Sequence, residues 1–145
     1  MTLPAGPPVA TLVSLDEAWP DGNPRETGFH FNGYSLDPQG TPTFRYHWND
    51  VAVTDSITPF PASPDNGLRR TVTVTSAARL QNTYLRIVAG QQIDSVDGAI
   101  VADGMTMRFE GCESLVRTIN NQRELLVPVV VDPDGKATVT YTIVW

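Results

Sequence analysis

The sequence has 145 residues, enough for one domain with a hydrophobic core of its own, and a formal net charge of −6. The negative charge disfavours nucleic-acid binding, and no apolar run approaches the roughly 18 residues that a membrane-spanning helix needs. Twelve Pro and 11 Gly residues stand among many β-branched residues, a breaker about once every six positions, which excludes helical bundles and coiled coils.

The chain is expected to open with a linker and to continue as one all-β domain. Residues 1–8 are rich in Pro and have neither the basic start nor the apolar stretch of a signal peptide. Residues 9–145 are predicted to form the domain, beginning with a short strand at residues 9–13. Residues 16–27 then form a loop broken by Pro and Gly, and we expect Trp19 to pin this loop to the body of the domain.

Short strands account for most of the remaining chain. Residues 29–60 show a continuous strand-and-turn pattern, and residues 59–67 form a second long loop. Further strands are predicted at residues 68–76, 83–89, 91–95, 99–102, 105–110, 123–131 and 137–145. Helical turns fit only at residues 76–81 and 113–121. About ten short strands at this spacing are typical of an antiparallel β-sandwich.

Two turns of the same design fix the register of their flanking strands. Asp-Pro-Gln-Gly-Thr at residues 37–41 and Asp-Pro-Asp-Gly-Lys at residues 132–136 both place Gly at the left-handed position, so that the first and fifth residues pair. The first turn therefore predicts a hairpin around residues 37–41. The second predicts a C-terminal hairpin in which Val127 lies opposite Tyr141.

Alternation along residues 29–60 predicts an aromatic core face. A two-residue turn at residues 49–50 joins two of the strands, and a bulge at residues 32–33 shifts the side-chain parity by one residue. With this bulge, the inward side chains are those of Phe29, Phe31, Tyr34, Leu36, Phe44, Tyr46 and Trp48. Arg45 is expected on the outer face.

The two histidines form a candidate metal site. With the bulge, His30 and His47 fall on the same outer face of neighbouring strands, where two imidazoles can share a metal ion. Zinc and copper sites need three or four ligands, and Asp50, a nearby carboxylate, lies in a turn. The sequence favours the alternative, two exposed polar side chains on a sheet face, and no cofactor is expected.

No group of residues in the sequence has the pattern of a catalytic centre. A Gly-x-Ser-x-Gly elbow is absent, and Cys112, the single cysteine, stands among carboxylates that disfavour a thiolate. The acidic pairs at residues 16 and 17, 94 and 97, and 110 and 113 are expected to be solvated surface charge rather than a general acid and base. We therefore predict that the chain is not an enzyme.

The aromatic side chains have two interpretations. They can stack on sugar rings, as in carbohydrate-binding sandwiches, or they can fill the core. The predicted register directs Tyr34, Tyr46, Trp48 and Trp145 inward, which favours core packing. Trp19, in a loop, is the aromatic residue that the sequence leaves free as a platform for carbohydrate.

A pattern of Gly, Pro and aromatic residues extends over most of the chain. It runs Trp19-Pro20, FNGYSLD at residues 31–37, GTPTFRY at 40–46, VAVTD at 51–55, LRRT at 68–71 and LRIVAG at 85–90. The pattern resembles a β-rich accessory region of large extracytoplasmic bacterial proteins, which join a glucose/sorbosone-dehydrogenase-like propeller to c-type cytochrome modules. The chain has neither a haem-attachment motif nor the length of a propeller. The resemblance therefore implies a non-catalytic companion module in a periplasmic or secreted protein.

These features together predict an accessory domain that presents a surface to neighbouring domains of its parent protein. A Pro-rich start and a strand at the end are expected of a segment excised from a longer chain, and a charged content of only 18% suggests that some surface is normally covered. The isolated domain is expected to be a monomer without membrane insertion. The alternatives are a carbohydrate-binding module and a small metal-binding β-domain.

Overall fold

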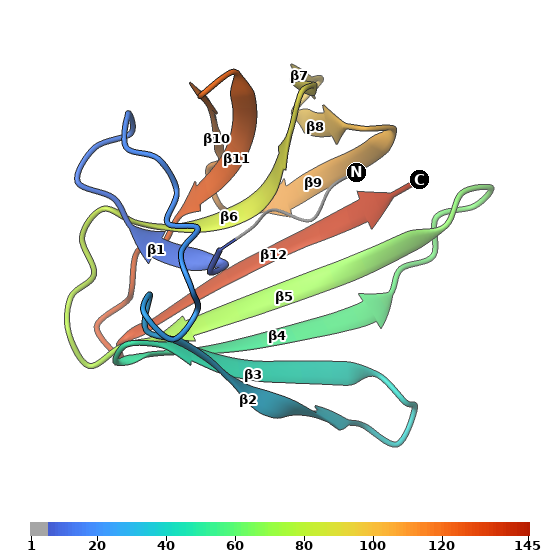
Figure 1. Cartoon of the computed structure of the whole chain (residues 1–145). Helices are drawn as coiled ribbons and strands as arrows, with labels where there is room; N and C mark the ends of the chain where they lie inside the picture. The colour runs from blue at the N-terminus through green and yellow to red at the C-terminus, as the bar shows by residue number, and fades with distance from the viewer. Residues whose placement is uncertain (1–5) are drawn as a thin grey trace.

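The protein is an all-β sandwich of two antiparallel sheets (Figure 1). The computed structural model describes residues 6–145, and this part of the chain contains twelve strands rather than the expected ten or so. No helix among these residues is long and apolar enough to cross a membrane. The predicted fold class is confirmed.

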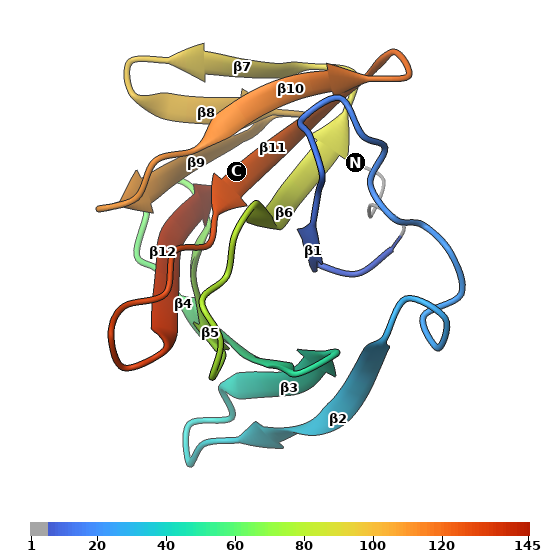
Figure 2. The ribbon, with the colours of Figure 1, turned by 90° about the vertical axis from the view of Figure 1, so that its left-hand side faces the viewer.

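The two sheets differ in size. The smaller sheet contains, in spatial order, β1 (Val9–Thr11), β6 (Thr83–Gly90), β11 (Gln122–Pro128) and β10 (Leu115–Ile119). The larger sheet contains β2 (Phe29–Leu36), β3 (Pro42–Trp48), β4 (Val51–Pro59), β5 (Gly67–Thr75), β12 (Lys136–Val144), β9 (Met105–Glu110), β8 (Ala99–Ala102) and β7 (Ile93–Val96). Figure 2 shows the larger sheet curving from β7 and β8, near β10 and β11, to β2 and β3 at the opposite end of the molecule.

A hydrophobic core fills the space between the sheets. Val72 and Tyr141 of the larger sheet and Leu85 of the smaller sheet are almost fully buried there. A second cluster lies on the other face of the smaller sheet, where Leu126 packs with Trp19. The smaller sheet is therefore covered on both faces.

The hairpins at the start of the larger sheet have the predicted register. Trp48 lies opposite Val51 across the turn at residues 49–50. The ladder between β2 and β3 shifts by one residue between Phe31 and Gly33, and Gly33 has a φ of 102°, in the left-handed region that favours glycine. The predicted bulge is confirmed.

Contrary to the prediction, the bulge does not bury the whole aromatic face. Phe31, Tyr34 and Leu36 share a face with buried Tyr46, yet their exposed fractions are 58%, 63% and 58%. Trp145, also expected inward, is 51% exposed. For the strand residues, Figure 2 shows that β2 lies at the end of the larger sheet, away from β1 and β6 of the smaller sheet. Only the part of these strands near Phe29, Tyr46 and Trp48 packs against the core.

The predicted C-terminal hairpin is wrong. The turn at residues 132–136 closes as expected, with the N–H of Asp132 donating to Lys136 O at 2.7 Å. The strands then separate, because β11 pairs with β6 and β10 whereas β12 pairs with β5 and β9. Leu125 is buried in the core and Leu126 beneath the Trp19 loop, so both faces of β11 are covered and the strand belongs inside the smaller sheet.

Residues 113–121 contain a strand, β10, rather than a helical turn. Asn120 and Asn121 have positive φ values of 48° and 61° and join β10 to β11, with Ile119 opposite Gln122. Two adjacent residues with positive φ are typical of the type I′ hairpin turn. The Asn-Asn pair is the signal that the sequence interpretation missed.

Candidate functional site

Exposed apolar side chains gather on β2. Phe31, Tyr34 and Leu36, which we call the β2 strip, are three of the large hydrophobic residues that remain mostly exposed in residues 6–145. They lie on the inner face of the larger sheet, and the Tyr34 ring is 6.0 Å from the ring of Phe44 on β3. Contiguous exposed apolar surface of this kind marks binding sites more often than isolated apolar residues do.

The β2 strip also lies on an edge. β2 is the first strand of the larger sheet and pairs with β3 alone. It has 8 residues, whereas the other edge strands, β7, β1 and β10, have 4, 3 and 5. β2 contains no Asp, Glu, Lys or Arg, the residues that proteins use to protect edges from pairing. It is therefore a long edge strand without charge protection.

A polar cluster lies on the same inner face, on β4, β5 and β12. Arg70 donates to both carboxylate oxygens of Asp55, at 2.9 Å from Nε to Oδ1 and 2.6 Å from Nη2 to Oδ2. Arg70 Nη1 also donates to the hydroxyl of Tyr141 at 2.8 Å. Burial disfavours the charged form of Arg70, but the hydrogen bond and charge of Asp55 outweigh it and raise the pKa of Arg70. The cluster ties β4, β5 and β12 together.

Tyr46 adds a buried hydroxyl to this face. Its oxygen has no hydrogen-bond partner among the described residues, and its ring packs against Phe29 with centroids 5.3 Å apart. Burial raises the pKa of Tyr46, and the nearby charge of Asp55 raises it further. The Tyr46 side chain is therefore held neutral, and its ring serves the core.

The histidines lie where the sequence predicts. His30 and His47 pair across β2 and β3, with stacked rings 4.9 Å apart, on the outer face. Asn32 Nδ2 donates to His47 Nδ1 at 3.0 Å. No group of three or more His, Cys, Asp or Glu residues in the described part of the chain is arranged to hold a metal ion. The pair supplies at most two ligands.

Trp19 is buried, which contradicts the expectation that it is exposed as a sugar platform. Its exposed fraction is 5%, and Nε1 donates to Pro7 O at 2.8 Å. The Arg86 guanidinium lies 4.7 Å from the centre of the ring, a cation–π contact. Trp19 therefore pins its loop to the body, as predicted, and also holds Pro7, within the segment expected to be a linker.

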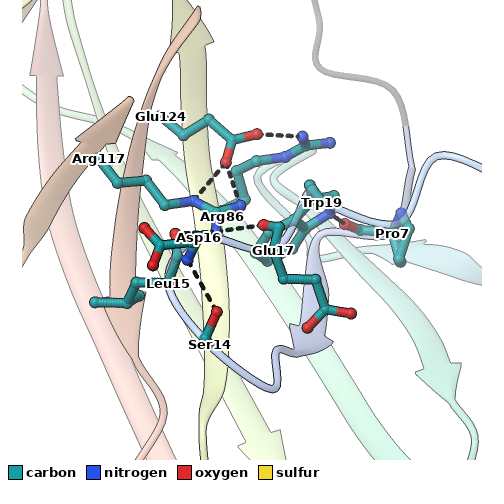
Figure 3. Close-up of polar contacts among 9 residues, drawn as sticks. All are labelled: Pro7, Ser14, Leu15, Asp16, Glu17, Trp19, Arg86, Arg117 and Glu124. Carbon is teal, nitrogen blue, oxygen red and sulfur yellow. Dashed lines mark hydrogen bonds and ion pairs between the residues drawn. The ribbon is translucent and has the colours of Figure 1, made fainter. Parts of the chain in front are cut away.

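A buried charge cluster supports the same loop (Figure 3). Glu124 accepts from Arg86 Nη1 at 2.9 Å and from Arg117 Nε at 2.8 Å. Arg117 Nη1 donates to the backbone oxygens of Leu15 and Glu17 at 2.9 and 2.7 Å. Burial lowers the pKa of Arg86, partly offset by Glu124. The donors and acceptors of this cluster bind one another and the loop, so its role is structural.

Cys112 and the acidic pairs form no shared site. Burial raises the pKa of the half-buried Cys112 thiol, which disfavours the reactive thiolate. Glu110 pairs with Arg69, and Asp94 pairs with Arg123 at 2.8 Å. Glu110 and Asp94, one member each of two of the acidic pairs, are therefore engaged in surface ion pairs.

The β2 strip is the site that sequence analysis missed. Its residues were assigned to the core because alternation reports which face a side chain points to, not whether another sheet covers that face. A strand without charged residues is equally typical of a central, buried strand, so the sequence of β2 contains no signal that places it at an edge. Comparison with protein-family models, curated proteins and solved structures found no match.

Proposed function

We propose that the protein is a non-catalytic accessory domain that binds a neighbouring domain or protein through the β2 strip. The observation that carries this proposal is the grouping of three mostly exposed apolar side chains on one uncharged edge strand. Surfaces of this kind lose unfavourable contact with water when a partner covers them. The resemblance described above supports an extracytoplasmic parent protein as the setting.

The arrangement of the charged groups is consistent with a binding role. Arg70 with Asp55, and Arg86 with Glu124, form internal ion pairs whose hydrogen bonds link neighbouring strands. Such pairs stiffen a scaffold and leave the adjoining surface to present apolar side chains. The β2 strip then lies on a rigid sheet, as a good interface requires.

The test is binding of the purified domain to the other domains of its parent protein, supplied as separate chains. We expect saturable binding by isothermal titration calorimetry, weakened about tenfold or more by Tyr34→Ala, because central aromatic residues dominate interfaces. Val96→Ala, on the opposite edge of the same sheet, is the matched control and should bind like the unaltered domain. Equal affinity of all three proteins would overturn the proposal.

Carbohydrate binding is the second candidate, and the exposed ring of Tyr34 is the observation that favours it. Aromatic rings offer apolar faces for sugar rings. A panel of oligosaccharides in the same calorimeter separates the candidates. Sugar binding abolished by Tyr34→Ala, without affinity for neighbouring domains, would favour the carbohydrate-binding module.

A further inference from the structure

We propose that β2 accepts an extended segment of the partner as an added antiparallel strand, so that the larger sheet continues across the interface. This inference rests on the proposed function and specifies its partner: a strand with apolar side chains on one face and polar side chains on the other. The direction of the backbone groups along β2 carries the argument.

The turn after β2 fixes which backbone groups face outward. The N–H of Asp37 donates to Thr41 O at 3.1 Å, so the backbone groups of Asp37 face the following strand, β3. In an antiparallel pair, residues bonded to the neighbouring strand alternate with residues that are not. The backbone groups of Ser35 therefore face β3, and those of Leu36 and Tyr34 face away from it.

Two further observations agree with this alternation. Pro42, which has no N–H to donate, lies opposite Leu36. At the start of β2, the N–H of Phe29 donates to Pro24 O at 3.0 Å, so Phe29 faces away from β3 and, by alternation, Phe31 does too. The extra residue of the bulge accounts for the odd spacing between Phe31 and Tyr34, so that the backbone groups of both residues face away from β3. Apart from Phe29, whose N–H is bonded to Pro24, the residues whose backbone groups face away from β3 are thus those of the β2 strip.

The residues with outward backbone groups are also those with exposed apolar side chains, and this overlap defines the chemistry of the partner. An added antiparallel strand exchanges N–H···O=C bonds with the residues whose backbone faces outward, and side chains of such pairs share one face of the sheet. Those pairs contain Tyr34 and Leu36, so the partner's opposing residues lie over the exposed apolar face. Its alternate residues lie beside Ser35 and His30 on the polar outer face. A strand alternating apolar and polar residues satisfies both faces.

A second copy of the chain is a less suitable occupant of the same edge. A two-fold antiparallel pair centred on residues 31–36 sets Leu36 against Phe31, but it sets Tyr34 against Gly33, whose backbone faces β3. The register with Tyr34 opposite Phe31 instead brings Leu36 against Phe29, whose N–H is already bonded to the preceding loop. The register centred on Ser35 sets Tyr34 against Leu36, but it leaves Phe31 opposite Gln39 in the turn. Two copies also each carry a net charge of −6, which opposes their association. The occupant we propose is therefore a segment of a different domain.

The probe is a synthetic peptide in which Val alternates with Thr, flanked by Lys for solubility. Two matched versions carry backbone N-methyl groups, one on the Val residues and one on the Thr residues. In the proposed geometry the Val N–H groups face β2 and the Thr N–H groups face solvent. We expect the Thr-methylated peptide to bind like its parent and the Val-methylated peptide to lose at least about tenfold in affinity. Equal affinity of both, or no binding of the parent, would overturn the proposal.

Amide hydrogen exchange provides the second readout. In the free domain we expect fast amide exchange at Tyr34 and Leu36 and slow exchange at Ser35. Of these three residues, only Ser35 has an N–H that faces β3. With the parent peptide bound, the amides of Tyr34 and Leu36 should slow by about tenfold or more. Peptide binding that leaves both rates unchanged would show side-chain docking without an added strand and would overturn the inference.

These experiments separate the inference from the function on which it rests. If neighbouring domains bind but the amides of Tyr34 and Leu36 keep their exchange rates in that complex, the proposed function stands and strand addition fails. If the peptide binds with the expected protection but no neighbouring domain does, the edge accepts strands and the proposed partner is wrong. A dimer of the domain alone would contradict the choice of occupant.

Discussion

Two buried tyrosines of the core differ in whether the hydroxyl group has a hydrogen-bond partner. Tyr141 accepts from Arg70, whereas the hydroxyl of Tyr46 has no partner among the described residues. A buried polar group without a hydrogen bond costs about 1–3 kcal/mol. We expect Tyr46→Phe to leave the free energy of unfolding unchanged or to raise it by about 1 kcal/mol, and Tyr141→Phe to lower it by about 1–2 kcal/mol. Urea unfolding at pH 7 measures both, and equal losses would contradict the assignment.

The same tyrosines make stability depend on alkaline pH. Burial raises the pKa of Tyr46 and of Tyr141 above the ordinary value of 10.0. The unfolded chain therefore loses these protons first, so the contribution is complete below about pH 10 and is lost as pH rises further. Tyr46→Phe should make the decline in the free energy of unfolding between about pH 9 and pH 11 shallower. An unchanged slope would show that Tyr46 is not shielded from solvent.

Glu124 is the residue on which the Trp19 loop depends most. It neutralises two buried guanidinium groups, and its loss leaves them uncompensated. We expect Glu124→Gln to lower the free energy of unfolding by about 3–5 kcal/mol. Glu110→Gln is the control, because its ion pair with Arg69 is half exposed and worth at most about 1 kcal/mol. Similar losses from both variants in urea unfolding would contradict the structural role of the cluster.

The histidine pair gives a prediction about metals. Two imidazoles without a third ligand should bind zinc or copper only weakly. Elemental analysis of protein purified without chelators should therefore find less than one metal ion per chain. A stoichiometric ion that disappears when His30 and His47 are both replaced by Ala would contradict this and would favour the metal-binding alternative.

At the scale of elements, local signals in the sequence predicted the two hairpins formed by β2, β3 and β4. The Asp-Pro-x-Gly turn at residues 37–41 and the parity argument for the bulge gave the observed register of β2 and β3. The same turn motif at residues 132–136 led to the wrong prediction of a C-terminal hairpin. A turn sets the direction of the chain but not the sheet that the next strand joins. That choice depends on contacts of β11 with β6 and β10, which are not local in sequence.

The bulge in β2 is testable through its glycine. A Cβ on Gly33 would meet nothing within 4 Å, so a substitution costs only the left-handed backbone. Gly33→Ala should lower the free energy of unfolding by about 1–2 kcal/mol. Gly22→Ala, in the first loop, has no such φ and should change it by less than about 0.5 kcal/mol. Equal thermal midpoints for both variants would mean that the ladder is regular at Gly33.

At the scale of the whole molecule, the candidate site follows from the order of strands in the larger sheet. The sequence indicates that Phe31, Tyr34 and Leu36 share one face of β2, and the structure agrees. It does not indicate that β2 lies at the edge, away from β1 and β6 of the smaller sheet, because both properties depend on pairings between distant segments. The fold class and the hairpins that join β2, β3 and β4 were therefore predictable, and the exposure of the strip was not.

The central claim is that a partner pairs with the outward backbone of β2, and one pair of variants tests it directly. Leu36→Ala removes the apolar side chain and keeps the N–H, whereas Leu36→Pro also removes the N–H, which faces away from β3 and is dispensable for the fold. Affinity for the neighbouring domain is measured by calorimetry for both variants, after circular dichroism confirms equal folding. We predict that Leu36→Pro binds at least about fivefold more weakly than Leu36→Ala. Equal affinity of the two variants would contradict the claim.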